Sequence, residues 1–263
     1  MRLHFISGLP RSGSTLLGAI LRQNPEITAG MTSPVSSLYS AMESAMARRN
    51  ENAVWITDDQ RIEILRGVFH GYYKDRSGIV FDTSRFWTHR LTALSKLFPE
   101  AKIICCVRDL SWIIDSFERL YRRNAFEPSG VYNYSTDTTI YSRAAIVSGS
   151  GGVVGFALDG LREALSGEQK DKVLLVEYEH LCKSPDAAVA RIYDFIGEPK
   201  FAHDFDHVEY SASEFDRNIG ARGLHDVNGA VRWTPRETIL PDNLFASYVN
   251  DQFWRNPLKL VAA

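Results

Sequence analysis

The chain has 263 residues, of which 44% are hydrophobic and 24% are charged, and its formal net charge is -2. This length and composition are those of a globular protein that can bury a substantial core. The near-neutral charge excludes a global basic field for nucleic acid or an anionic membrane. Local groups must therefore provide any attraction for an anionic ligand.

The three cysteines, Cys105, Cys106 and Cys182, predict neither a disulfide framework nor a metal site. Two of them are adjacent in an apolar run, where cysteine behaves as a small hydrophobe, and no metal-ligand spacing is present. We therefore expect a reducing, cytoplasmic location and no metal. The N-terminus has too few apolar residues for a signal segment, and no run approaches 18 apolar residues, so no membrane span is expected.

Short apolar runs alternate with helical patterns along the first 200 residues. The runs predict strands at residues 3–7, 79–82, 102–107 and 173–177. The patterns between them predict helices at residues 15–23, 58–73 (with Thr57 as N-cap), 86–97, 112–123, 155–165 and 185–196. This alternation predicts an α/β fold, with a central parallel sheet flanked by helices and a ligand at the carboxyl ends of the strands. We expect one domain over residues 1–263.

Two polar stretches, residues 127–152 and 211–236, do not fit this alternation. Both contain several glycines. Long loops in a compact domain are often lids or binding loops, so these two are candidates for such a role. Residues 148–152 are equally compatible with a disordered surface excursion.

Residues 8–15 read GLPRSGST and lie between the first predicted strand and the first predicted helix. Glycines allow backbone N–H groups to converge on an anion, and the helix N-terminus adds a partial positive charge. We expect an anion to bind here through the six residues Pro10, Arg11, Ser12, Gly13, Ser14 and Thr15. Ser14 stands where the Gly-x4-Gly loop of nucleoside triphosphatases has a lysine, which disfavours a bound γ-phosphate. A plain turn with a serine helix cap is the simpler alternative.

A second anion site is predicted where the third strand gives way to a helix. Arg108 ends that strand, and Ser116 follows eight residues later, about two helical turns on. An arginine fork and a hydroxyl suit a terminal phosphate. The alternative is a structural arginine paired with Asp109 or Asp115.

Taken together, these motifs resemble those of sulfotransferases that use 3′-phosphoadenosine 5′-phosphosulfate (PAPS). Residues 8–17 (GLPRSGSTLL) are similar to the family's 5′-phosphosulfate loop, and residues 106–116 (CVRDLSWIIDS) to its 3′-phosphate motif. The segment 175–181 (LVEYEHL) resembles a later strand and helix, and places Tyr178 near the adenine. The tyrosylprotein-like and bacterial natural-product members are the most similar in character.

The resemblance implies a P-loop-like sulfotransferase fold and transfer of a sulfuryl group from PAPS to an acceptor hydroxyl. The acceptor would be a small molecule, a lipid or a glycan, and adenosine 3′,5′-bisphosphate (PAP) would be the product. No metal is required, and the protein would mainly position the partners and stabilise negative charge. Arg11 would hold the phosphosulfate, while Arg108 and Ser116 would hold the 3′-phosphate. The sequence fixes neither the acceptor nor the oligomeric state.

The base that takes the acceptor proton is where the chain departs from the family pattern. Neither the glutamate of tyrosylprotein-like members nor the Lys-Thr-His of cytosolic members is present. We expect Asp82, at the end of the second predicted strand, to be the base, although a structural role for it is equally compatible with its position. His89 and Glu43 are the reserve candidates, and Arg85 would stabilise charge in place of the missing lysine.

Arg222, in a basic glycine-containing loop, is predicted to reach the 3′-phosphate, with a solvated turn as the alternative. Aromatic residues around the second strand could line an acceptor pocket or simply pack in the core: Trp55, Phe69, Tyr72, Tyr73, Phe86 and Trp87.

Two other functions remain open. One is a P-loop small-molecule kinase using ATP and Mg²⁺, with Asp109 near the metal. The other is a non-catalytic nucleotide-binding or scaffold protein.

Overall fold

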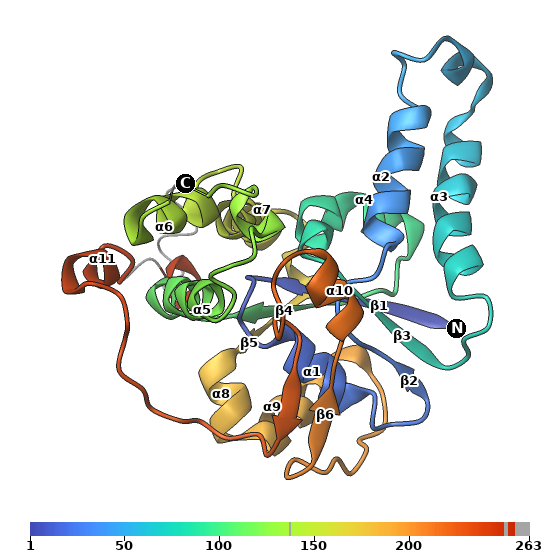
Figure 1. Cartoon of the computed structure of the whole chain (residues 1–263). Helices are drawn as coiled ribbons and strands as arrows, with labels where there is room; N and C mark the ends of the chain where they lie inside the picture. Colours follow the sequence, from blue (N-terminus) through green and yellow to red (C-terminus); the bar gives the residue numbers. More distant parts are fainter. Residues whose placement is uncertain (137, 250–251, 256–263) are drawn as a thin grey trace.

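A five-stranded, wholly parallel sheet forms the centre of the computed structural model, which describes residues 1–136, 138–249 and 252–255. The strands lie in the order β2-β3-β1-β4-β5 (Figure 1). Their bounds are β1 Arg2–Gly8, β2 Ile27–Thr28, β3 Ile79–Thr83, β4 Ile103–Val107 and β5 Val173–Glu177. The first strand therefore lies in the middle of the sheet, between β3 and β4.

Helices cover both faces of this sheet. One face packs on α1 (Ser14–Leu21), α8 (Tyr178–Lys183) and α9 (Pro185–Ile196). The other packs on a larger group: α2 (Val35–Ala45), α3 (Asp58–Tyr72), α4 (Leu91–Leu97), α5 (Leu110–Arg123), α6 (Ile140–Ser148) and α7 (Val153–Ser166). Helices α2 and α3 contact each other and project from the body as a hairpin (Figure 1).

The side chains of each strand alternate between the two faces of the sheet, and they form one hydrophobic core on each face. Phe5 and Cys105 point into the larger core, whereas their neighbours Ile6 and Cys106 point into the smaller one. All four side chains are fully buried. Successive side chains in a strand face opposite sides of the sheet, so a continuous apolar run serves both layers. The cysteines are free and pack as small hydrophobes, as expected.

The fold class and the main elements predicted from sequence are confirmed. All four predicted strands are present, and Thr57 caps α3 in a capping box with Gln60. The predicted helix at residues 86–97 is instead a 3-10 segment, η2 (Arg85–Arg90), followed by α4. The sequence analysis missed the short edge strand β2 and the antiparallel pair β6 (Val208–Tyr210) and β7 (Val227–Gly229).

The polar stretch 127–152 is largely structured. It contains a 3-10 turn at Gly130–Tyr132 and helix α6, and residues 149–152 form a tight turn into α7. A Cβ on Gly152 would overlap the carbonyls of Ile146 and Val147, so this turn needs glycine. The stretch 211–236 contains α10 (Ser213–Asn218) and β7, and α11 (Asp242–Ala246) follows it.

Residues Ile140–Ser166 are long and apolar enough to pass a composition test for a membrane span, which the sequence analysis did not anticipate. The turn at 149–152 divides this stretch into α6 and α7, and 44% of the apolar window is buried inside the domain. Core helices meet the same criteria, so one such stretch is weak evidence for a span.

Asp82 is a core residue in the structure and not the accessible base that we expected. Its carboxylate is fully buried and accepts hydrogen bonds from Ser33 Oγ (2.5 Å), Tyr73 Oη (2.6 Å) and Trp87 Nε1 (2.7 Å). Burial raises its pKa, and the three hydrogen bonds offset part of that rise. These contacts tie the segment before α2, the residue that follows α3, and η2 to the end of β3, which is a structural role.

Replacing Asp82 by alanine should therefore destabilise the protein. Three donors, of which Tyr73 and Trp87 are buried, would lose their acceptor, which costs about 3 kcal/mol of unfolding free energy. Tyr73→Phe removes one donor and keeps the carboxylate, so it should cost about 1 kcal/mol. Urea denaturation followed by circular dichroism measures both. An Asp82→Ala protein of wild-type stability that had lost only activity would return Asp82 to the catalytic machinery.

Candidate functional site

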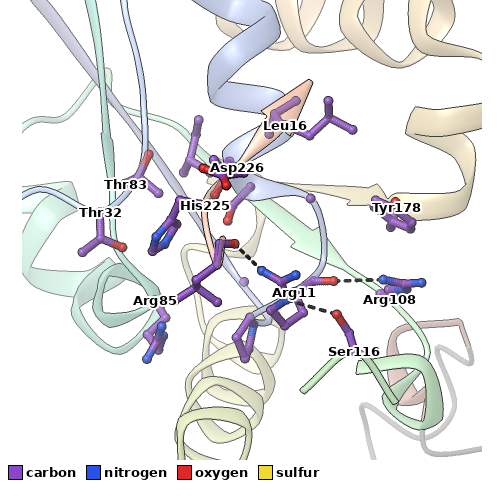
Figure 2. A pocket seen from close by; sticks show the side chains of 18 of the residues that line it. Arg11, Leu16, Thr32, Thr83, Arg85, Arg108, Ser116, Tyr178, His225 and Asp226 are labelled. Atoms are coloured by element: carbon purple, nitrogen blue, oxygen red, sulfur yellow. Dashed lines mark hydrogen bonds between the residues drawn. The ribbon is translucent and has the colours of Figure 1, made fainter. Parts of the chain in front are cut away.

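A pocket of about 650 Å³ opens at the carboxyl ends of the strands. The loop after β1, Thr83 at the end of β3, Arg108 after β4 and Tyr178 after β5 all line it. Parallel strands bring their carboxyl ends to one edge, so four separate stretches of sequence meet here. Figure 2 shows their side chains around Arg11.

The loop between β1 and α1 has an unusual backbone. Gly8 (φ 99°) and Gly13 (φ 91°) both lie in the left-handed region, and Arg11 (φ 57°) lies there without the freedom of glycine. A Cβ on Gly8 would overlap the Cys106 carbonyl, and one on Gly13 would lie 2.8 Å from the Tyr178 ring. Both glycines are therefore required by close approach as well as by φ.

This backbone leaves a set of donors unused. Within the described part of the chain, the amides of residues 11–15 donate no hydrogen bond, and Gly13 caps α1 without a side-chain contact. Unused amides at the start of a helix, together with the helix dipole, form a site for an anion. The alternative of a serine-capped turn does not hold, because Ser12 is buried and its hydroxyl donates to the Pro10 carbonyl.

Arg11 crosses the pocket from this loop. Its Nε donates to Ser116 Oγ (3.1 Å) and one terminal nitrogen donates to the Leu224 carbonyl. Burial and the neighbouring Arg108 guanidinium lower the pKa of Arg11 to about 10. It therefore stays protonated near neutral pH, and it lines the pocket together with a second cation, Arg108.

Arg108 lies beside Arg11, and one of its N–H donors has no partner among the described residues. Its Nη1 donates to the Arg11 carbonyl (3.3 Å), and its guanidinium lies 4.2 Å from the centre of the Tyr178 ring. Its Nε is buried and has no hydrogen-bond partner among the described residues. Burial lowers the pKa of Arg108. A cation held this way is stabilised by a bound anion.

The acidic residues next to Arg108 are engaged elsewhere. Asp109 pairs with Arg255 (2.8 Å), and Asp115 pairs with Arg119 and Arg236 (2.8 Å each). The alternative of a structural Arg108 ion pair is therefore not what the structure shows. Asp109 does not line the pocket, so it is not placed to hold a metal beside the loop.

Most of the predicted ligand-binding residues meet in this pocket. Those that line it are Pro10, Arg11, Gly13, Ser14, Thr15, Arg85, Arg108, Ser116 and Tyr178. Ser12 does not line it, because its side chain is turned into the loop. The predicted bases Asp82 and His89, and Arg222 of the second basic loop, do not line the pocket.

His89 and Glu43, the reserve bases, lie outside the pocket. His89 Nε2 is 2.8 Å from the Phe156 carbonyl, and its ring stacks on Phe156 at 3.9 Å. Glu43 pairs with Arg90 (3.0 Å). Both groups are occupied in packing helices together.

Arg222 also lies outside the pocket, against our expectation. It pairs with Glu127 (2.7 Å) and is largely exposed. The basic residue of this region that does line the pocket is Arg232, which follows β7. The Arg232 side chain is nevertheless largely exposed at the rim of the pocket. No local sequence pattern signals the pairing of β6 with β7, because these strands are sixteen residues apart.

The aromatic set does not form an acceptor pocket. Phe69 and Trp87 are fully buried in the core, whereas Trp55 (79% exposed) lies at the far end of the α2–α3 hairpin. The apolar lining instead comes from α5, α7, α10 and the loops around them: Phe117, Val131, Val153, Phe215 and Ile219.

The lining residues that the sequence did not predict include four polar ones near Arg85: Thr32, Thr83, His225 and Asp226. In Figure 2, His225 lies on the same side of Arg11 as Thr32, Thr83 and Arg85, while Arg108, Ser116 and Tyr178 lie on the other. The pocket thus has two halves with Arg11 between them. His225 belongs to the stretch 211–236, which the sequence marked as a binding loop without identifying the residue.

Several curated proteins that are similar to this chain are protein-tyrosine sulfotransferases. Protein-tyrosine sulfotransferase 1 of Danio rerio is 26% identical over 210 residues, covering 76% of this chain and 54% of that protein. The Homo sapiens protein-tyrosine sulfotransferase 1 is 31% identical over 120 residues, covering 41% of this chain and 32% of that protein. The chain therefore matches less than two thirds of the length of these two relatives.

Solved structures share the fold. A sulfotransferase domain from the curacin biosynthetic pathway has a TM-score of 0.52 and 18% identity, over 96% of this chain and 93% of that one. Mouse sulfotransferase SULT7A1, complexed with PAP, has a TM-score of 0.51 and 16% identity, over 98% of this chain and 81% of that one. The sulfotransferase family model matches residues 4–203, which include both anion-binding motifs. The chain thus belongs to the sulfotransferase family.

Proposed function

We propose that this protein transfers the sulfuryl group of PAPS to a hydroxyl of a small-molecule, lipid or glycan acceptor, releasing PAP. The observation that carries the proposal is the cluster of unsatisfied donors in one pocket. It combines the free amides of residues 11–15, Arg11 and the partnerless Nε of Arg108. These donors suit a ligand with two separate anionic ends.

The loop after β1 suits the 5′-phosphosulfate. Its amides and the hydroxyls of Ser14 and Thr15 can surround an anion at the start of α1, and Arg11 adds a full charge beside them. Negative charge grows on the bridging oxygen as the bond to sulfur breaks. Donors fixed in advance at that position stabilise the transition state more than the ground state.

Arg108 and Ser116 suit the 3′-phosphate. Ser116 lies 3.1 Å from Arg11 and faces the same pocket as the unpartnered side of Arg108. The Tyr178 ring lies between Arg108 and Gly13, and a purine can pack on such a ring. One nucleotide with phosphates at both positions would engage all three side chains.

The other half of the pocket is left for the acceptor. Thr32 and Thr83 offer hydroxyls, and Arg85 offers a guanidinium that has no ion pair among the described residues. The apolar residues of α5 and α7 complete the wall. A hydroxyl compound with an apolar body suits this mixed lining. The names of the curated relatives concern protein tyrosines, and a tyrosine hydroxyl belongs to the same chemical class.

A P-loop kinase is less well supported. Ser14 occupies the position that needs a lysine for the β- and γ-phosphates, and Asp109 is paired with Arg255. The mouse structure that shares this fold was solved with PAP bound. These observations favour PAPS as the donor.

Ligand-induced thermal shift separates the two donors. PAP at a hundred times its dissociation constant should stabilise the fold by about 2.7 kcal/mol and raise Tm by roughly 5–10 °C. ATP with Mg²⁺ should give a smaller shift at the same concentration, because nothing in the loop neutralises a γ-phosphate. A larger shift with ATP and Mg²⁺ than with PAP would overturn the proposal.

Arginine variants locate the two phosphates. Arg108→Ala should weaken PAP binding about 10–100-fold and AMP binding much less, because AMP has no 3′-phosphate. Arg11→Ala should weaken both ligands, since both carry the 5′-phosphate. Isothermal titration calorimetry gives the ratio of variant to wild-type dissociation constant for each variant with each ligand. Lys200→Ala, which removes an exposed cation paired with Asp194 outside the pocket, is the control. Equal losses for PAP and AMP in Arg108→Ala would remove the 3′-phosphate from this arginine.

A further inference from the structure

We propose that His225, oriented by Asp216, is the general base that takes the acceptor proton. This inference rests on the proposed function and supplies the group that Asp82 does not. His225 lines the acceptor half of the pocket, and Asp216 is fully buried behind it. A histidine with one ring nitrogen bound to a buried carboxylate and the other facing a pocket is the arrangement that general-base chemistry needs.

Asp216 fixes His225 at two points. One carboxylate oxygen is 2.5 Å from Nδ1 of the His225 ring, and the other accepts the His225 backbone amide at 2.9 Å. Asp216 belongs to α10, and the chain turns back between the two residues through Gly220 (φ 65°) and Gly223 (φ 77°). The turn places a ring nine residues later directly over the carboxylate.

This contact sets the tautomer. A carboxylate accepts hydrogen bonds, so Nδ1 carries the proton and Nε2 carries the lone pair. No hydrogen bond among the described residues uses Nε2 of His225. The basic atom is therefore the one left available to a ligand.

The ring also lies beside the reacting centre. Arg11 donates to the carbonyl of Leu224, the residue just before His225, so the anion loop and the base are linked through one residue. In Figure 2 the ring lies on the acceptor side of Arg11, with Thr83 and Arg85. A hydroxyl between Nε2 and a sulfuryl group held at Arg11 would be positioned for in-line attack.

Burial favours the neutral form of the His225 ring. Burial lowers the pKa of His225 below its ordinary value of 6.5, Arg11 and Arg85 lower it further, and Asp216 opposes them. Asp226, next in the chain, is exposed and accepts a hydrogen bond from Ser211, and the Phe215 ring packs at 5.5 Å. The net direction is downward, so the unprotonated form that can accept a proton dominates at neutral pH.

The step balances without a further reactant. The acceptor oxygen forms a bond to sulfur as its proton passes to Nε2 of His225. The bond between sulfur and the bridging phosphate oxygen breaks, and its electron pair leaves with PAP. The products are a sulfate ester, PAP and an imidazolium at His225, which then returns its proton to solvent. Asp216 does not touch the acceptor and is a positioning residue, which also stabilises that imidazolium.

The test measures transfer of ³⁵S from labelled PAPS to phenol, to 4-nitrophenol and to water at a pH where only 4-nitrophenol is ionised. His225→Asn keeps a donor for Asp216 but has no basic nitrogen. It should lower kcat/KM for phenol by about 10²–10⁴-fold. The loss for 4-nitrophenol should be much smaller, because that acceptor has no proton to remove. PAP affinity should match the wild type, which shows that the donor site is intact.

The pH profile tests Asp216. In the wild type, kcat/KM should fall as pH drops through the pKa of His225, because protonation removes the base. Asp216→Asn removes the charge that raises this pKa, so the acid limb should move to lower pH. If Asp216 had only a structural role, Asp216→Asn would lower kcat/KM at every pH and leave the acid limb at the same pH.

The chain contains a matched control. His207 also has its Nδ1 against a carboxylate, that of Asp204 (2.9 Å), but this pair is exposed and outside the pocket. His207→Asn should leave transfer unchanged.

Two results would overturn the inference alone: equal losses for both phenols in His225→Asn, or loss of transfer in Asp226→Asn with His225→Asn fully active. A wild type that binds PAP but transfers no label to any acceptor would instead overturn the proposed function, and this inference with it.

Discussion

The left-handed turn from Gly8 to Gly13 is the constraint on which the site depends. β1 lies in the centre of the sheet, so the chain leaving it passes directly against β4, where only glycine fits beside Cys106. In the loop that follows, the amides of residues 11–15 donate no hydrogen bond to the described residues, and the Arg11 side chain reaches Ser116. Arg108, at the end of the neighbouring strand, then lies beside it. The cationic character of this end of the pocket is a consequence of how two parallel strands end.

The ion-pair partners of the arginines decide which positive charges remain available to a ligand in the pocket. On α5, Asp115 is fully buried and holds two arginines and the backbone of Ile239, and Glu118 holds Arg143. Asp115 thereby anchors the C-terminal part of the chain and Glu118 anchors α6, so neither carboxylate pairs with Arg108. Cations in the pocket therefore keep unsatisfied donors, whereas those around it are neutralised. A pocket of positive potential can then exist in a protein whose net charge is -2.

Local patterns predicted one side of the pocket well and the other side poorly. The loop after β1 and the pair Arg108 and Ser116 are each close in sequence, so spacing alone picked out residues that share the pocket. The side that contains His225 is assembled from η2, α7 and the stretch 211–236, which meet only through tertiary packing. The expectation that Asp82 is the base was wrong because a carboxylate at a strand end is compatible with both catalysis and burial. Its three donors come from three elements that no local pattern connects to it.

Apolar periodicity and glycine spacing act over a few residues, so they were enough to predict the parallel α/β architecture and the position of the loop after β1. Which polar residues face the pocket depends on long-range packing. It turned Asp82 and His89 into packing contacts, paired Arg222 with Glu127 and brought His225 over Asp216. Those outcomes depend on partners that are distant in the chain, and a carboxylate, imidazole or guanidinium becomes structural or reactive according to which of them it meets.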